Sequence, residues 1–121
     1  QLEFHMLCMD PIHDGTFDQC QELKVKPMAW SPMAGGRLFD KTNEAADRLA
    51  QKAEELSSKY NDATLEQFAY AWIMAHPSLP VPIIGTNKIE RIESAARAAG
   101  IHLDREDWYA FWTAAHGHRV P

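Results

Sequence analysis

Short apolar runs alternate with longer amphipathic segments along this chain. Segments of strand length occupy residues 1–5, where polar and apolar residues alternate, and the apolar residues 28–30 and 81–84. Between them, apolar side chains recur at intervals of three or four residues, which predicts helices. We expect these helices at residues 16–23, 43–60, 64–76, 87–100 and 104–116. The order strand, helix, strand, two helices, strand, two helices indicates an α/β protein with a parallel sheet.

Polar residues mark where several of these helices should begin. A side-chain acceptor followed three residues later by an acidic or amide residue is typical of a helix N-terminus. Four pairs have this spacing: Thr16 with Gln19, Thr64 with Gln67, Asn87 with Glu90, and Asp104 with Asp107. We expect the stretches 6–15 and 33–42, which contain turn residues, to be loops.

Two segments have the same design, a short strand that runs through a polar turn into a helix. They are residues 28–37, Met-Ala-Trp-Ser-Pro-Met-Ala-Gly-Gly-Arg, and 82–91, Pro-Ile-Ile-Gly-Thr-Asn-Lys-Ile-Glu-Arg. In parallel α/β folds, ligands bind at the carboxyl ends of the strands, where such turns lie. Each turn also has cations close to its backbone N–H groups: Arg37 in the first, Lys88 and Arg91 in the second. The pattern favours a phosphorylated ligand.

Composition narrows the functional classes. The 121 residues suit a single domain, 1–121, and 45% hydrophobic with 24% charged residues is ordinary for a globular protein. A net charge of −5 argues against nucleic acid as a partner. No apolar run is long enough to cross a membrane, and no signal peptide is apparent. Cys8 and Cys20 lack metal-ligand spacing, so we expect free thiols and a cytoplasmic protein.

Three parallel strands are few for a sheet of this kind. A parallel sheet buries both faces, and its edges expose unpaired backbone groups. A complete (β/α)8 barrel needs roughly 250 residues, about twice the 121 present. The chain therefore forms a small open sheet, associates with a partner, or is part of a larger barrel. We favour the last.

Several motifs, in the right order and spacing, resemble the second half of an aldo/keto reductase barrel. Trp30-Ser31-Pro32-Met33 resembles the aromatic-Ser-Pro-Leu turn after the seventh strand of that family. Ile84-Gly85-Thr86, with Arg91 six residues after Gly85, resembles the cofactor-binding turn after the eighth strand. Gln1-Leu2-Glu3 resembles the sixth strand, and Asp14-Gly15-Thr16 with residues 35–39 is similar to the bacterial oxidoreductases of the family. The fold implied is the C-terminal portion of a (β/α)8 TIM barrel, three parallel strands with helices.

The resemblance also implies a cofactor, NADP(H), and a small-molecule carbonyl substrate that is reduced by hydride transfer. Gln1 would bind the nicotinamide carboxamide, and Trp30 would stack on the nicotinamide ring. Ser31, Met33 and the segment Gly35-Gly36-Arg37 would line the pyrophosphate, where glycine permits close backbone approach.

The second turn would hold the adenosine end of the cofactor. With Gly85 in the turn, Thr86, Lys88 and Arg91 would surround the 2′-phosphate and favour NADP over NAD. Where many members of the family have Glu-Asn to hold the adenine, this chain has Ser94-Ala95.

The catalytic residues of the family, an aspartate, a tyrosine, a lysine and a histidine, belong to the first half of the barrel. Tyr60, Tyr70 and Tyr109 all lie in predicted helices and do not replace the tyrosine. We therefore expect no catalytic residue here and a chain that is inactive alone. The missing N-terminal half, or self-association, would complete the fold. The alternative is a non-catalytic module that assembles with itself or with a separate N-terminal chain.

Each of these residues also has a simpler interpretation. Trp30 could pack rather than stack on a cofactor, and Arg91 could pair with Glu90 or Glu93. The two glycines could serve the loop alone, and Gln1 could be an ordinary residue of an edge strand. A metal site is not expected, because four candidate ligands have no recognised spacing: His5, Cys8, Asp10 and His13.

Overall fold

Three short strands form a parallel sheet in the order β1–β2–β3. The computed structural model describes residues 1–121, and the strands are β1 (Leu2–Glu3), β2 (Met28–Trp30) and β3 (Val81–Pro82). Both pairings are parallel, with Leu2 opposite Ala29 and Ala29 opposite Pro82. The predicted parallel sheet is confirmed, and β2 has its predicted bounds, whereas β1 and β3 are shorter than the predicted segments that contain them.

Pro82 lies in a strand without interrupting the ladder. The N–H groups of Val81 and Ile83 donate to the carbonyls of Pro27 and Ala29, both at 2.8 Å. Successive N–H positions alternate between the two sides of a strand, so the nitrogen of Pro82 faces away from β2. Since β3 is an edge strand, the missing donor removes no hydrogen bond within the sheet.

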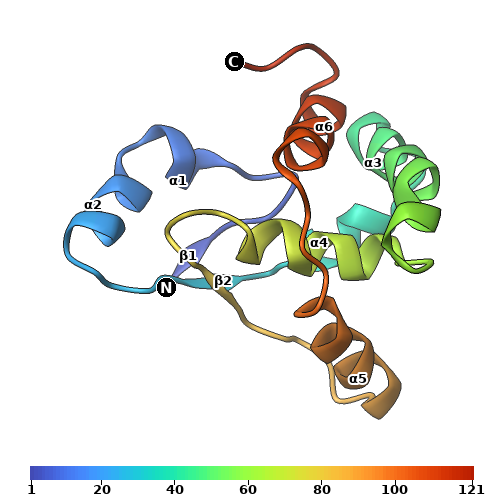
Figure 1. Ribbon diagram of the computed structural model, residues 1–121, viewed down its shortest axis with the longest axis horizontal. Helices are drawn as coiled ribbons and strands as arrows, with labels where there is room; N and C mark the ends of the chain where they lie inside the picture. Colours follow the sequence, from blue (N-terminus) through green and yellow to red (C-terminus); the bar gives the residue numbers. More distant parts are fainter.

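Helices follow every strand and make up most of the molecule (Figure 1). Strand β2 leads through the 3₁₀ helix η1 into α3, which continues into the 3₁₀ helix η2. No helix is both long and apolar enough to traverse a lipid bilayer. The helices are α1 (Asp10–His13), α2 (Thr16–Glu22), η1 (Ala34–Phe39), α3 (Glu44–Leu56), η2 (Ser57–Tyr60), α4 (Leu65–Met74), α5 (Ile89–Ala98) and α6 (Arg105–His116).

Two predicted loops contain helical turns. The stretch 6–15 includes α1, which has Pro11 in its first turn, where a fixed φ and a missing N–H suit a helix start. The stretch 33–42 includes η1, which is interrupted by Gly35 and Gly36 at φ values of 63° and 91°. Single helical turns leave no periodicity in the sequence, which is why the loop predictions missed them.

The predicted helix starts at Thr64 and Asp104 are confirmed. Thr64 accepts a hydrogen bond from the Gln67 N–H, and the Gln67 side chain accepts one from the Thr64 N–H, a complete capping box. Asp104 accepts from the Asp107 N–H at 2.9 Å. Each bond satisfies an N–H that the first turn of a helix leaves without a partner.

The capping roles predicted for Thr16 and Asn87 are wrong, although α2 does begin at Thr16. Thr16 is already inside α2; Gly15 is the N-cap at φ 86°, and the Thr16 N–H donates to the Asp14 side chain at 2.9 Å. In α5 the N-cap is Lys88 and has no side-chain cap, so Asn87 lies one residue too early. In both turns tertiary geometry, rather than the pattern of polar residues, determines where the helix begins.

This difference gives a direct test of the two caps. Thr64→Ala should lower the free energy of unfolding by about 1 kcal/mol, because it leaves an N–H of α4 without its acceptor. Asn87→Ala should change it by less than about 0.5 kcal/mol, because Asn87 caps no helix. Urea unfolding of the two variants measures both values. An equal loss in both would contradict the assignment of the α5 start.

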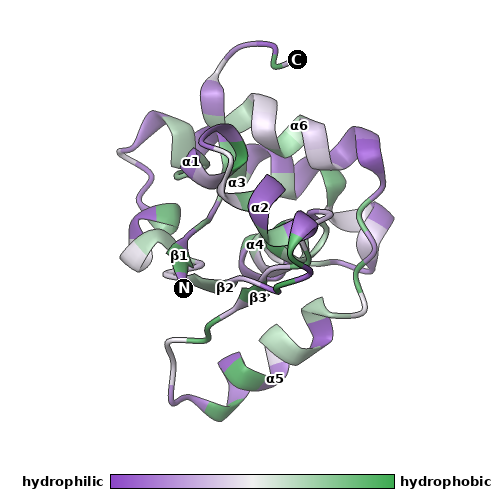
Figure 2. Ribbon diagram, turned by 90° about the vertical axis from the view of Figure 1, so that its left-hand side faces the viewer, coloured by the Kyte–Doolittle hydropathy of each residue, from purple (hydrophilic) through white to green (hydrophobic).

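The core lies between the sheet and the helices, around a group of large aromatic side chains. Trp72, Phe4, Phe17, Phe68 and Phe111 are each at most 1% exposed. In Figure 2, α3, α4 and α6 lie together above the strands, and each contributes buried apolar side chains to this core. The helices pack in pairs, α3 against α6 and α4 against α5 and β3.

The other face of the sheet is exposed. Alternation along the strands and the register place five side chains on this face, which we call the open face: Glu3, Met28, Trp30, Val81 and Ile83. Its four apolar members are between 36% and 48% exposed. A parallel sheet normally buries both faces, so the open face is the surface against which further strands or another chain would pack.

Candidate functional site

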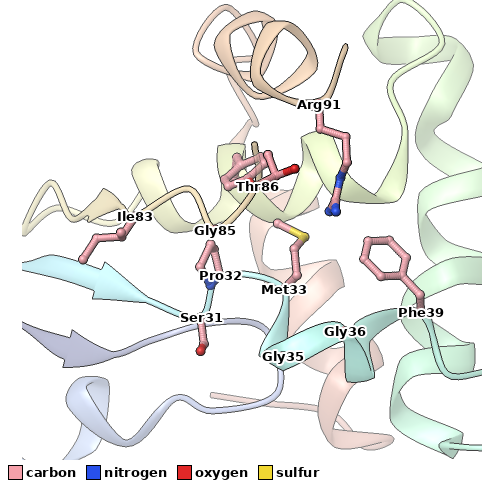
Figure 3. A pocket seen from close by; sticks show the side chains of 11 residues that line it. Ser31, Pro32, Met33, Gly35, Gly36, Phe39, Ile83, Gly85, Thr86 and Arg91 are labelled. Atoms are coloured by element: carbon pink, nitrogen blue, oxygen red, sulfur yellow. The ribbon is translucent and has the colours of Figure 1, made fainter. Parts of the chain in front are cut away.

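A pocket of about 420 Å³ lies at the carboxyl ends of β2 and β3. Its walls come from the turn after β2, the turn after β3, and the facing sides of α4 and α5 (Figure 3). The lining residues are Ser31, Pro32, Met33, Gly35, Gly36, Phe39, Tyr70, Ile83, Gly85, Thr86 and Arg91. The two turns that share a design in the sequence therefore meet at one cavity.

The turn after β2 is tight and has several residues of positive φ. Ser31 and Ala34 have φ values of 52° and 54°, and the Ala34 N–H donates to the Ser31 carbonyl at 2.7 Å. Gly35 and Gly36 follow with positive φ, and a Cβ on either would meet no atom within 4 Å. Their glycine identity thus follows from backbone conformation, and the space beside them is open.

The turn after β3 leads into a helix whose first N–H groups have no side-chain cap. The Lys88 N–H donates to the Thr86 hydroxyl at 3.2 Å, which holds Thr86 at the pocket wall. Helix α5 then begins at Ile89 without a side-chain acceptor. An uncapped helix N-terminus carries a partial positive charge and free donors, which attract anions.

Arg91 is the charged side chain that lines the pocket. Its Nε and Nη2 donate to Oε1 of Glu66 in α4, at 3.2 and 2.9 Å. The bonds to Glu66 raise the pKa of the guanidinium. The partner is therefore neither Glu90 nor Glu93, the two acidic neighbours considered from the sequence. Figure 3 shows Arg91 and Met33 pointing toward the same space.

Tyr70 contributes to this wall, although the sequence did not single it out for binding. It is 3% exposed, and burial raises the pKa of its phenol. Glu66 lies one helical turn earlier on α4, so the two side chains share one face of that helix. The only sign of a binding role in the sequence was the four-residue spacing of Glu66 and Tyr70 in an apolar helix. That spacing equally predicts that Tyr70 belongs to the core.

Four of the predicted binding residues lie outside the pocket lining: Gln1, Trp30, Arg37 and Lys88. Gln1 precedes β1, at the opposite end of the sheet from the turns. Trp30 is 41% exposed on the open face. Arg37 folds back, with its Nε donating to the Ala34 carbonyl at 2.9 Å and its Nη2 3.9 Å from Glu3. Lys88 is exposed at the start of α5.

Potential metal ligands do come together beside β1, although not in the set considered from the sequence. Ligand atoms of Glu3, His5 and Cys8 lie within 4.8 Å of one another. The Leu7 N–H donates to Nδ1 of His5, so the proton of the neutral ring is on Nε2, which faces Glu3 at 3.0 Å. Both nitrogens are thereby engaged, and burial lowers the pKa of His5. The arrangement is that of a hydrogen-bonded histidine.

Comparisons with known proteins agree on one family. The model of the aldo/keto reductase family matches residues 1–114. The oxidoreductase YdhF of Escherichia coli is 45% identical over 93% of this chain, and a 6-dehydroglucose reductase of Novosphingobium aromaticivorans is 39% identical over all of it. The thermostable aldo-keto reductase Tm1743 superimposes with a TM-score of 0.70 over 93% of the chain, at 24% identity.

The match covers only part of each relative. The chain spans 39% of YdhF, 40% of the 6-dehydroglucose reductase and 38% of Tm1743. The expected fold class, three parallel strands with helices from the C-terminal portion of a barrel, is confirmed. The chain therefore belongs to the aldo/keto reductase family.

Proposed function

We propose that this chain is the NADP(H)-binding part of an aldo/keto reductase whose whole protein reduces aldehydes or ketones. The observation that carries the proposal is the single pocket formed by two strand-end turns, with the guanidinium of Arg91 in its wall. Membership of the family also supports a redox function, because its members are oxidoreductases. When bound, the cofactor supplies the hydride that reduces the carbonyl carbon.

The residues of the pocket suit a ligand with phosphate groups. Gly35 and Gly36 leave open space beside the backbone, so a pyrophosphate could approach closely there, next to Ser31 and Met33. Arg37, at the edge of this turn, would have to leave the Ala34 carbonyl to contact it.

The adenosine end would lie at the second turn. Thr86 and Arg91 line the pocket, and Gly85 lies between the strand and the helix start. Lys88 is the exposed N-cap of α5, outside the pocket lining, and would have to turn toward the pocket to contact a 2′-phosphate. Arg91 shares its guanidinium with Glu66, so the phosphate would bind to the donors that Glu66 leaves free.

The nicotinamide would lie outside this pocket, over the open face. Trp30 ends β2 with its ring exposed there, a flat apolar surface suited to a flat heteroaromatic ring. Gln1 is our proposal for the carboxamide contact. We assign no catalytic residue to this chain, and proton transfer would fall to residues of the rest of the barrel. Cys8 and Cys20 are free thiols, which supports a reducing compartment such as the cytoplasm.

The substrate class is a small carbonyl compound. A relative of which the chain covers 40% is named 6-dehydroglucose reductase, which suggests a sugar carbonyl as one candidate. Loops of the whole barrel determine substrate specificity in this fold, so we propose a small carbonyl compound and no individual substrate.

Titration calorimetry with NADPH and NADH tests the cofactor. NADPH should bind more tightly, and its affinity should fall more steeply as salt rises from 50 to 500 mM, because charge–phosphate contacts are screened. Equal affinities at low salt would contradict the assignment of the 2′-phosphate site.

The exposed open face favours a second possibility, assembly with another chain. Met28, Trp30, Val81 and Ile83 are partly exposed there, and each sheet edge is free. Native mass spectrometry separates the cases. A mass near 35–40 kDa, about that of a whole barrel, supports an N-terminal partner, whereas one or two copies of the 13.7 kDa chain support a non-catalytic module.

A further inference from the structure

A second cavity, of about 510 Å³, lies among α1, α4 and α6. It shares no lining residue with the pocket at the strand ends. In both ribbon views α6 and α5 lie at opposite ends of the molecule, and α5 carries Arg91 of the first pocket (Figures 1 and 2). The volume of this second cavity is within the range of small-molecule sites. Neither the sequence motifs nor the proposed cofactor site accounts for it.

Aromatic rings form much of its wall. Trp108, Tyr109 and Trp112 follow one another on α6 and all line the cavity. Tyr109 and Trp112 are stacked at 5.6 Å with 11° between their planes, and Trp108 meets Trp112 edge-on at 5.5 Å. Trp108 is itself stacked on Trp72 at 4.9 Å. Rings held in this way form a rigid apolar wall, and the flat face of a single ring suits a planar ligand.

His76 contributes a ring N–H that has no acceptor in the protein. His76 is 9% exposed and lines the cavity. Its Nδ1 accepts a hydrogen bond from the Ser78 N–H at 3.1 Å, so the ring proton lies on Nε2, for which the protein offers no acceptor. Burial lowers the pKa of His76, against a weaker opposite effect of Asp18. The Nε2 N–H is therefore available to a ligand in the cavity.

Two further groups add to the donor character. The indole N–H of Trp112 is buried and has no acceptor in the protein. Arg105 lines the cavity, forms no ion pair, and has its guanidinium 5.9 Å from the centre of the Tyr109 ring. None of the lining residues is acidic. The cavity therefore combines flat apolar walls with N–H donors and one positive charge.

We propose that this cavity binds a planar aromatic carboxylate. The ring system would lie flat on one of Trp108 and Trp112 and meet the other edge-on, because their planes are 87° apart. The carboxylate would accept hydrogen bonds from Arg105 and from Nε2 of His76. This combination explains why a histidine donor and a free guanidinium face the same aromatic cavity. The proposal is independent of the cofactor assignment, since the two pockets share no residue.

The probe for the test is 2-naphthoate, compared with 2-naphthylmethanol, which has the same ring and no charge. The four tryptophans give separate indole N–H signals in ¹H–¹⁵N spectra. Naphthoate should shift the signals of Trp108 and Trp112 and leave that of Trp30 unchanged. Arg105→Gln should weaken naphthoate binding about tenfold and leave naphthylmethanol binding unchanged. Saturating NADPH should not alter the affinity for naphthoate.

Arg97→Gln is the matched control, because it removes the same charge from an exposed position on α5. It should leave naphthoate binding unchanged. An equal loss in Arg97→Gln and Arg105→Gln would show attraction by net charge only and would overturn the proposal. Equal affinity for the acid and the alcohol, or a shift of the Trp30 signal in place of Trp112, would also overturn it. Thermal melting of both variants checks that each remains folded.

Discussion

Arg91→Gln should weaken NADPH binding by roughly 10- to 100-fold and leave NADH binding nearly unchanged. A hydrogen bond between charged groups contributes about 1.5–3 kcal/mol, and each 1.4 kcal/mol is a factor of ten in affinity. NADH has no 2′-phosphate and so loses little. Titration calorimetry of both cofactors measures the ratio, which is the informative quantity because it cancels any general effect on folding.

Two matched variants distinguish a role of Arg91 in cofactor binding from a role in stabilising the fold. Arg97→Gln removes an exposed arginine from the same helix, outside the pocket, and should affect neither cofactor. Glu66→Gln removes the anion that holds Arg91 at 2.9 Å. It should leave NADPH binding as tight as in the native protein or tighter, because a negative charge beside the phosphate is lost.

A purely structural role for Arg91 predicts a different result. Arg91→Gln and Glu66→Gln would then have the same effect, because each breaks the same ion pair, and NADPH and NADH would be weakened equally. That pattern would reject the 2′-phosphate assignment while leaving the aromatic cavity among α1, α4 and α6 untouched.

Trp72→Ala should lower the free energy of unfolding by about 3–5 kcal/mol. Trp72 is fully buried and lies flat against Trp108, with 4° between the ring planes. Each indole N–H donates to the other residue's carbonyl, at 3.1 and 2.9 Å. The substitution therefore leaves a large cavity and also removes one of these two hydrogen bonds between α4 and α6, the one that the Trp72 indole donates.

Trp30→Ala is the control for this loss, since Trp30 is 41% exposed on the open face. It should cost less than about 1 kcal/mol. Trp72→Phe, which keeps a ring and loses the N–H donor, should fall between the two and remain measurable by urea unfolding if Trp72→Ala does not fold. Equal effects of Trp72→Ala and Trp30→Ala would contradict the described core.

Local sequence was sufficient for the elements with strong local signals. The strand at Met28–Trp30 is apolar and ends at Ser31-Pro32, and it was predicted with its observed bounds. The capping box of Thr64 and Gln67 was also predicted, because both partners lie within one turn of the same helix. Short elements such as α1 were missed, since four residues contain no periodicity.

The candidate site, too, was predicted only in part from the sequence. The turns after β2 and β3 were identified from their glycines, polar residues and cations, and most of their residues line one pocket. Tyr70 and Glu66 were not predicted as part of the site, because they belong to a helix and lie more than ten residues from either turn along the chain. Arg37 was expected in the pocket and instead bonds its own loop.

The sequence by itself determined the order of strands and helices, the parallel α/β class, and the family to which its turn motifs point. Those properties depend on periodicity and on residues a few positions apart. Only the tertiary structure decided that Arg91 pairs with Glu66 and that His76 and Arg105 share an aromatic cavity. These residues are 25 and 29 positions apart, and they meet because helices pack across the molecule, which no local pattern specifies.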